Sequence, residues 1–239
     1  MRLLLFLFFF IGTAALAEDA ILGFDPDGSQ AQQALEAEFD SHLNADDMDA
    51  WLRELSSAPH HVGSPRGREV VEFVAAKFRS WGYDTEIAEY EVLFPSPRIR
   101  ELELVSPSRF SASLTEDSLA EDPSTSNIDD LLPPYNAFSS DGDVEGELVF
   151  VTYGTPDDYE ILDRYGISVD GKIVIARYGG SWRGIKPKLA AEKGAIGTII
   201  YSDPEDDGYG AGDTYPQGPF KHESAVQRGS VMDMPTYPG

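Results

Sequence analysis

The chain has 239 residues, enough for one large domain or two small ones with a buried core. Its apolar content of 41% and charged content of 25% are ordinary for a globular protein. The formal net charge of −24 disfavours binding to phosphate backbones and anionic lipid, so we expect no nucleic-acid partner and no membrane partner. The sequence contains no cysteine, which excludes disulfides, thiolate metal sites and a cysteine nucleophile.

The first residues predict an export signal. Arg2 gives a short positive start, Leu3 to Ile11 is an unbroken apolar run, and Ala15-Leu16-Ala17 is a small-x-small cleavage site. The run is too short to cross a bilayer as a helix, which needs roughly 20 residues. We therefore predict a signal peptide over residues 1–17 and an exported protein, periplasmic or secreted. A retained anchor is the alternative.

Two helices are predicted after a leader at residues 18–44, which shows little periodicity. The first starts at Ala45 and ends before Pro59. The second is capped by Ser64-Pro65 and leaves through Gly82 in the left-handed conformation. Apolar residues recur on one face of each helix: Trp51, Leu52 and Leu55 in the first, and Val70, Val71, Val74, Phe78 and Trp81 in the second.

Strands are predicted next, at Tyr83 to Leu93 and at Ile99 to Val105, where apolar and charged residues alternate. Ser106 to Pro134, rich in Ser, Pro, Asp and Glu, is interpreted as a long surface excursion. Beyond it the pattern is strand, helix, strand, helix, strand. The strands are predicted at Leu148 to Tyr153, Gly171 to Arg177 and Gly197 to Tyr201, and the helices at Thr155 to Gly166 and Lys186 to Lys193. This order predicts an α/β layer with some parallel pairing.

Most signatures of catalysis are missing. The four histidines, His42, His60, His61 and His222, have no helical metal-ligand spacing, and no H-E-x-x-H occurs. Ser181 lacks the second glycine of a nucleophile elbow. Asp203 to Gly208 resembles the start of a calcium loop, but Thr214 stands where a bidentate Glu is wanted. A solvated acidic turn is the alternative there.

Arg183 is the candidate binding residue. It lies between an aromatic residue and a glycine, just after a predicted buried strand, in Gly179-Gly180-Ser181-Trp182-Arg183-Gly184. Arginine binds carboxylates through two parallel, charge-assisted hydrogen bonds, which suits recognition of a peptide's C-terminal carboxylate. Taken alone, the pattern also fits an ordinary surface arginine in a loop.

Several blocks of the chain, in order and at matching spacing, resemble the glutamate carboxypeptidase II family of zinc peptidases. The blocks are Pro59 to Ser64, Tyr90 to Leu93, Pro133 to Ser139, Gly146 to Val151, Gly171 to Gly179, Gly194-Ala195, Ile199 to Pro204 and Val226 to Gly229. The resemblance covers about residues 46–239. It implies an α/β fold, with an incomplete N-terminal segment of the peptidase domain at 45–97. A mixed α/β protease-associated (apical) domain follows at 98–239, its C-terminal part missing.

The resemblance also assigns roles to residues. Arg183 aligns with the family's arginine that grips the substrate's terminal carboxylate. Ser230 falls where the glutamate-specific enzyme has an Asn that contacts the side-chain carboxylate, which puts strict Glu preference in doubt. Ile185 also departs from the family, replacing an Asn. The transferrin receptor shares the architecture without catalysis and lacks this arginine, so Arg183 favours an enzyme as the parent protein.

The resemblance places the ligands of a two-zinc site and the general-base Glu later in the family's sequence. We therefore expect no catalytic residue and no cofactor in this chain, and two zinc ions in the full-length parent. That parent would be a carboxypeptidase-type exopeptidase acting on peptides with a free C-terminal carboxylate, with a homodimer possible. A non-catalytic protease-associated binding module, or a receptor-like ectodomain, is the alternative.

A first prediction concerns this chain alone, which is expected neither to hydrolyse peptides nor to hold stoichiometric zinc. The reason is that the expected ligand set is missing and the histidines are poorly spaced. Metal analysis after dialysis at neutral pH checks this prediction, and two zinc ions per chain would contradict it.

Overall fold

A computed structural model describes residues 20–232, so the predicted signal peptide lies outside the described residues. The chain divides into two compact units, with the division between Glu54 and Leu55. Within the described part, no helix is both long and apolar enough to span a membrane.

The first unit contains helix α1 (Pro26–Ser41) and most of α2 (Ala45–Leu55). Helix α2 confirms the predicted short helix. Helix α1 lies in the predicted leader, where the sequence pattern indicates no helix. Its start is fixed locally, because the Asp25 side chain accepts a hydrogen bond from the Gly28 N–H at 2.6 Å and Pro26 occupies the first turn. Good helix formers then fill it, although its apolar side chains form no buried face.

The second unit begins with α3 (Pro65–Ser80), which confirms the predicted longer helix. Ser64 caps it by accepting from the Gly67 N–H at 2.9 Å, and Gly82 follows it with a φ of 88°. One face of the helix stays open to solvent. The exposed apolar side chains are Val71, Val74, Phe78 and Trp81, at 37% to 51% exposure.

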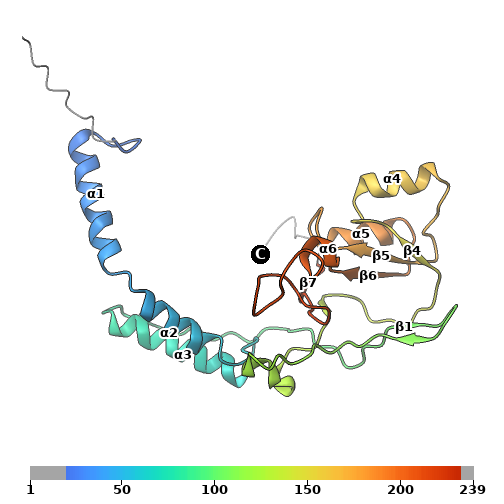
Figure 1. Cartoon of the computed structure of the whole chain (residues 1–239), viewed down its shortest axis with the longest axis horizontal. Coiled ribbons are helices and arrows are strands. Elements are labelled where there is room, and N and C mark those ends of the chain that lie inside the picture. Colours follow the sequence, from blue (N-terminus) through green and yellow to red (C-terminus); the bar gives the residue numbers. More distant parts are fainter. Residues whose placement is uncertain (1–19, 233–239) are drawn as a thin grey trace, which may run out of the picture. The chain divides into compact units, whose positions relative to one another are not determined.

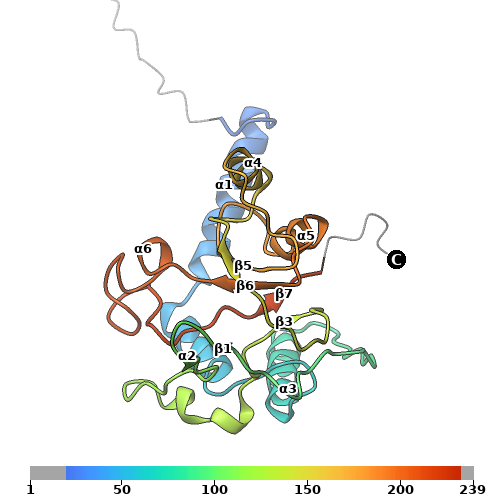
Figure 2. The ribbon, with the colours of Figure 1, turned by 90° about the vertical axis from the view of Figure 1, so that its right-hand side faces the viewer.

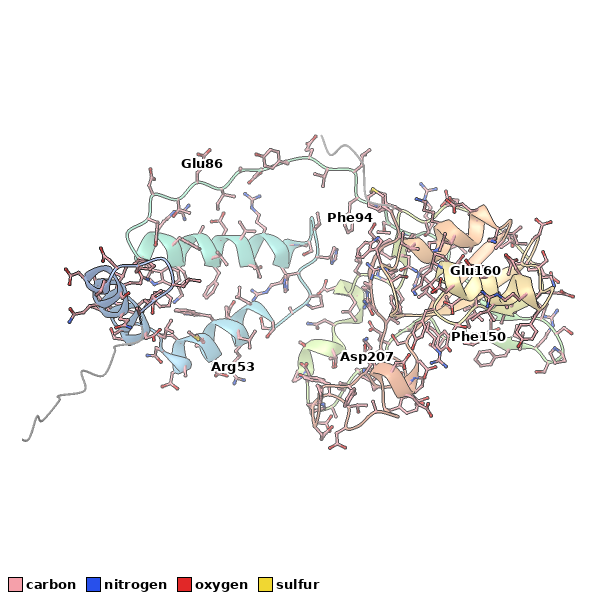
Figure 3. The ribbon with its side chains drawn as sticks, turned by 90° about the horizontal axis from the view of Figure 1, so that it is seen from above. Arg53, Glu86, Phe94, Phe150, Glu160 and Asp207 are labelled. Carbon is pink, nitrogen blue, oxygen red and sulfur yellow. The ribbon has the colours of Figure 1, made fainter. Side chains whose placement is uncertain are left out.

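The stretch after α3 is extended but forms no strand, so the prediction of a strand over Tyr83 to Leu93 is wrong. Figure 3 shows this stretch as an open ribbon, with Glu86 labelled within it and Phe94 just after it. A strand needs a neighbour to pair its backbone N–H and C=O groups, and residues 20–232 supply none here.

This exposed face gives a second prediction, for hydrogen exchange in the purified chain. Amides from Val70 to Trp81 are expected to exchange at least about tenfold faster than those of the central β-sheet, because few buried contacts hold the helix. Mass spectrometry of exchanged peptides measures both regions in one sample. Uniformly slow exchange across Val70 to Trp81 in a monomer would contradict the prediction.

Short elements lead into the sheet. Strand β1 (Glu103–Leu104) pairs antiparallel with β2 (Phe110–Ser111), so the predicted strand at Ile99 to Val105 is confirmed only over two residues. Two 3₁₀ turns follow, η1 (Pro123–Ser126) and η2 (Ile128–Asp130). Strand β3 (Asn136–Ala137) then pairs in parallel with β7 (Gly229–Ser230), which joins segments far apart in the sequence.

The predicted α/β layer is confirmed. Strands β4 (Leu148–Phe150), β5 (Ile173–Arg177) and β6 (Gly197–Tyr201) form a parallel sheet in chain order. Helices α4 (Pro156–Arg164) and α5 (Ile185–Glu192) make the two crossovers. Because both crossovers run in the same direction, right-handed connections place both helices on one face of the sheet, as Figures 1 and 2 show. A last short helix, α6 (Pro204–Asp207), follows β6.

The core lies between the sheet and these two helices. Its buried members are Val151, Tyr159, Val169, Val174, Ala176 and Ala190. Strand β5 alternates buried and half-buried residues, so Val174 and Ala176 face the helices. This packing fixes the carboxyl ends of the three strands, where the loops of interest begin.

Candidate functional site

The candidate site is the loop from Tyr178 to Gly184, which joins the carboxyl end of β5 to α5. In open parallel sheets, ligands bind at this edge. The loop turns through Gly179 and Gly180, with φ values of 93° and 71° that side chains rarely adopt. A Cβ on Gly180 would also lie 2.9 Å from the Cβ of Tyr153, so the loop packs closely on the neighbouring β4–α4 connection.

Arg183 is half-buried in this loop and fixed from several sides. Its Nε donates a hydrogen bond to the backbone oxygen of Ser230 at 2.9 Å. Its Cζ lies 5.2 Å from the centroid of the Trp182 ring and 5.9 Å from that of Tyr178, both within cation–π range. The bond to Ser230 uses only Nε, and the guanidinium also makes a side-chain hydrogen bond with Tyr178. Nη1 and Nη2 are the parallel pair with which an arginine can hold a carboxylate.

The structure brings the two predicted site residues, Arg183 and Ser230, into contact. The pairing of β3 with β7 places Ser230 beside the loop, and the Val231 N–H donates to the Ala137 oxygen at 3.0 Å. Ser230 contacts Arg183 through its backbone oxygen, whereas its hydroxyl accepts from the Met232 N–H at 3.0 Å. The Ser230 side chain is therefore engaged locally.

Gly229 is a site residue that sequence reasoning missed. A Cβ at this position would lie 1.9 Å from Nη2 of Arg183 and 2.3 Å from its Cζ. The guanidinium therefore rests directly on the Gly229 backbone, and only glycine allows that approach. The available signal was a glycine next to the proposed Ser230, but its meaning depends on the β3–β7 pairing.

A third prediction follows for Gly229→Ala. The added methyl group is expected to push the guanidinium off the backbone and to break the bond from Arg183 Nε to Ser230. The Arg183 Nε–H signal in NMR should then lose its shift and its protection from exchange. Gly142→Ala is the matched control, since a Cβ there meets nothing within 4 Å. An unchanged Arg183 signal in Gly229→Ala would contradict this packing.

Tyr178 forms one wall of the site as a neutral phenol. Its hydroxyl donates to the Gln227 oxygen at 3.1 Å, which ties the loop to the segment before β7. Burial raises the pKa of Tyr178, and the Arg183 guanidinium only partly opposes that effect. The ring therefore offers Arg183 an uncharged face at neutral pH.

The acidic turn after β6 is occupied by internal contacts. Asp203 accepts from the Glu205 N–H at 3.0 Å and pairs with Arg177 at 3.2 Å. Asp206 pairs with the same arginine at 3.6 Å, and Asp207 pairs with Lys221. In residues 20–232, no group of three or more His, Asp or Glu side chains is arranged to hold a metal ion, so the described residues do not fit a zinc site.

Comparisons with known proteins agree on this part of the chain. The PA domain matches residues 144–231. A probable glutamate carboxypeptidase of Arthroderma benhamiae is 37% identical over 198 residues, covering 80% of this chain and 27% of that protein. The probable glutamate carboxypeptidase AMP1 of Arabidopsis thaliana is 33% identical, covering 77% of this chain and 24% of that protein.

A relative with a different name also matches. The aminopeptidase NAALADL1 of Mus musculus is 32% identical over 203 residues, covering 80% of this chain and 27% of that protein. The chain thus spans about a quarter of the length of the curated relatives that it matches.

Proposed function

We propose that this chain supplies the carboxylate-binding part of an exported zinc exopeptidase. The chain carries a PA domain and is homologous to the N-terminal region of glutamate carboxypeptidase II and NAALADL proteins. One observation carries the proposal. Arg183 is held by Ser230, Trp182 and Gly229, and its bond to the Ser230 oxygen is made by Nε and not by Nη1 or Nη2.

The chemistry of this arrangement suits a substrate's terminal carboxylate. A guanidinium fixed in advance loses little side-chain entropy when it binds, so more of the charge-assisted bonding is realised as affinity. Arg183 would orient the peptide, and residues beyond this chain would hold the two zinc ions of the full-length parent. No step of catalysis is assigned to residues 20–232.

The charge of Arg183 supports a carboxypeptidase rather than an aminopeptidase. An aminopeptidase must recognise the α-ammonium of its substrate, which a guanidinium repels, whereas a carboxypeptidase must recognise the terminal carboxylate. The relatives include proteins named for both activities. We therefore propose peptides with a free C-terminal carboxylate as the substrates, acidic C-terminal residues included.

The test begins with the DNA downstream of codon 239. A continuous frame that encodes His, Asp, Glu-Glu, Asp and His ligands would allow the complete enzyme to be produced. Matched peptides with a free C-terminal acid and with a C-terminal amide are then compared. We expect strong preference for the acid. Equal turnover of acid and amide, or a frame without those ligands, would reject the carboxypeptidase and favour a non-catalytic binding module.

A further inference from the structure

Lys186 is a buried lysine next to the candidate site. It lies in the first turn of α5 and is only 1% exposed. Its Nζ donates to the backbone oxygen of Tyr153 at 2.5 Å and to that of Gly179 at 2.7 Å. A buried lysine bonded to two main-chain oxygens from different loops requires a structural explanation.

The two loops that Lys186 joins have unusual backbones. The β4–α4 connection has left-handed φ values at Thr152 (51°) and Gly154 (66°), on either side of Tyr153. The β5–α5 loop has left-handed values at Gly179 and Gly180. Such turns direct carbonyl groups away from the regular ladder, and a buried carbonyl without a donor costs about 1–3 kcal/mol. Lys186 supplies a donor to one carbonyl in each loop.

Burying the charged ammonium group of Lys186 costs free energy, and this cost indicates the role of the residue. Burial lowers the pKa of its ammonium group, which means that the fold disfavours the charged form, although Asp158 acts in the opposite direction. A methionine would fill similar space without that penalty. What lysine specifically provides here is the pair of bonds to the Tyr153 and Gly179 oxygens.

Lys186 is also directly connected to Arg183. Its backbone N–H donates to the Arg183 oxygen at 3.2 Å, so Lys186 and Arg183 belong to one turn. Gly179, at the other end of that loop, is held by the Lys186 side chain at 2.7 Å. The loop that carries Arg183 is therefore fixed to one residue at both of its ends.

We propose that Lys186 is a positioning residue for Arg183. It holds the Tyr178–Gly184 loop against the β4–α4 connection, and this keeps Arg183 in place. The expected effect of Lys186 on substrate binding rests on the proposed function, whereas its effect on the position of Arg183 does not. Without the Lys186 side chain, the loop would move relative to β7, and the bond from Arg183 Nε to the Ser230 oxygen would be made only part of the time.

The first experiment reads Arg183 directly in the complete 239-residue chain. The Nε–H signal is assigned in NMR by its loss in Arg183→Lys, and its exchange with water is measured. We expect Lys186→Met to speed that exchange by about tenfold or more, because bonds from a charged donor are lost. Lys193→Met, at the exposed end of the same helix where Nζ pairs with Asp163, is the control and should leave the rate unchanged.

Loss of folding must be separated from loss of positioning. Amide signals of β5 and β6 report whether the sheet is intact in each variant. If Lys186→Met does not fold, Lys186→Gln replaces it, since its shorter side chain keeps a donor but does not span both loops. An intact sheet with an unchanged Arg183 Nε–H exchange rate, in whichever variant folds, would overturn the proposal.

The second experiment uses the complete enzyme and the acid and amide peptides. Lys186→Met is expected to raise KM for the acid about tenfold, with a smaller change in kcat and little change for the amide. A purely structural role would lower turnover of both substrates in parallel and would overturn the proposal. If wild type does not distinguish acid from amide, the proposed function fails instead, and the NMR comparison still decides the role of Lys186.

Discussion

Under the proposed function, replacing Arg183 with Ala in the complete enzyme is expected to lower kcat/KM for a free-acid peptide by about thirty- to a hundredfold. This corresponds to about 2–3 kcal/mol, the usual worth of hydrogen bonds to a charged group. KM should rise because the carboxylate loses its partner. The value of kcat should also fall, because a peptide bond that is no longer aligned reaches the reacting groups less often.

Two comparisons make this result specific. Arg183→Lys keeps the charge but loses the planar fork, so it should already weaken use of the acid. Arg164→Ala removes an arginine whose side chain is 73% exposed on α4, and should change activity and stability by less than about 0.5 kcal/mol. If Arg183→Ala still prefers acid over amide as strongly as wild type does, Arg183 does not bind the carboxylate.

The elements that sequence reasoning predicted well are those fixed by local signals. Helices α3 and α4 begin at Ser64-Pro65 and Thr155-Pro156, where proline suits the first turn. The Ser64 hydroxyl caps α3, and at the start of α4 the Asp158 carboxylate accepts from the Thr155 N–H. Strands β5 and β6 are short, mainly apolar runs rich in β-branched residues, and a glycine lies at or just before the start of each. For these elements, nearby residues contain most of the information.

The elements that it predicted poorly depend on distant partners or lack a pattern. Tyr83 to Leu93 has the composition of a strand, but pairing requires a neighbour that residues 20–232 do not offer. Helix α1 fails in the opposite way. It forms from its Asp25-Pro26 cap and its helix formers without a buried apolar face, so periodicity could not reveal it.

The candidate site combines both cases. Residue types alone were compatible with Arg183 as a binding residue and as an ordinary surface arginine. The family resemblance favoured the binding residue. Its contact with Ser230 depends on a two-residue ladder, β3 with β7, which no local pattern predicts. Because the backbone oxygen of Ser230 makes that contact, any residue there could hold Arg183 in the same way. The Ser230 hydroxyl takes no part in holding Arg183, since it accepts from the Met232 N–H instead.

Lys186 was predicted only as the start of a helix. Its burial follows from the left-handed turns at Gly154 and Gly179, which leave carbonyl groups facing the space that its ammonium group fills. Lysine is usually exposed, so composition argued against a buried position. The site is therefore supported by residues whose importance appears only once neighbouring loops are placed together.

The candidate site is supported by the core of the parallel sheet. Val174→Ala is expected to lower the stability of that sheet strongly. Val174 is completely buried in β5, among the side chains under α4 and α5. Removing two buried methyl groups should lower the free energy of unfolding by about 2–3 kcal/mol, from lost burial and from the cavity that remains. Val92→Ala is the matched control, because Val92 is 62% exposed in the extended stretch and should cost less than about 0.5 kcal/mol.

Urea titration followed through amide NMR signals of β5 and β6 measures this loss in the sheet itself, which matters because the chain has two compact units that need not unfold together. For a unit of this size, the expected loss corresponds to a fall in Tm of roughly 4–12 °C. The loops that position Arg183 leave the carboxyl ends of these same strands. Val174→Ala should therefore also speed exchange of the Arg183 Nε–H in proportion to the lost stability. Equal effects of Val174→Ala and Val92→Ala would show that the parallel sheet is not the stable centre on which the site is built.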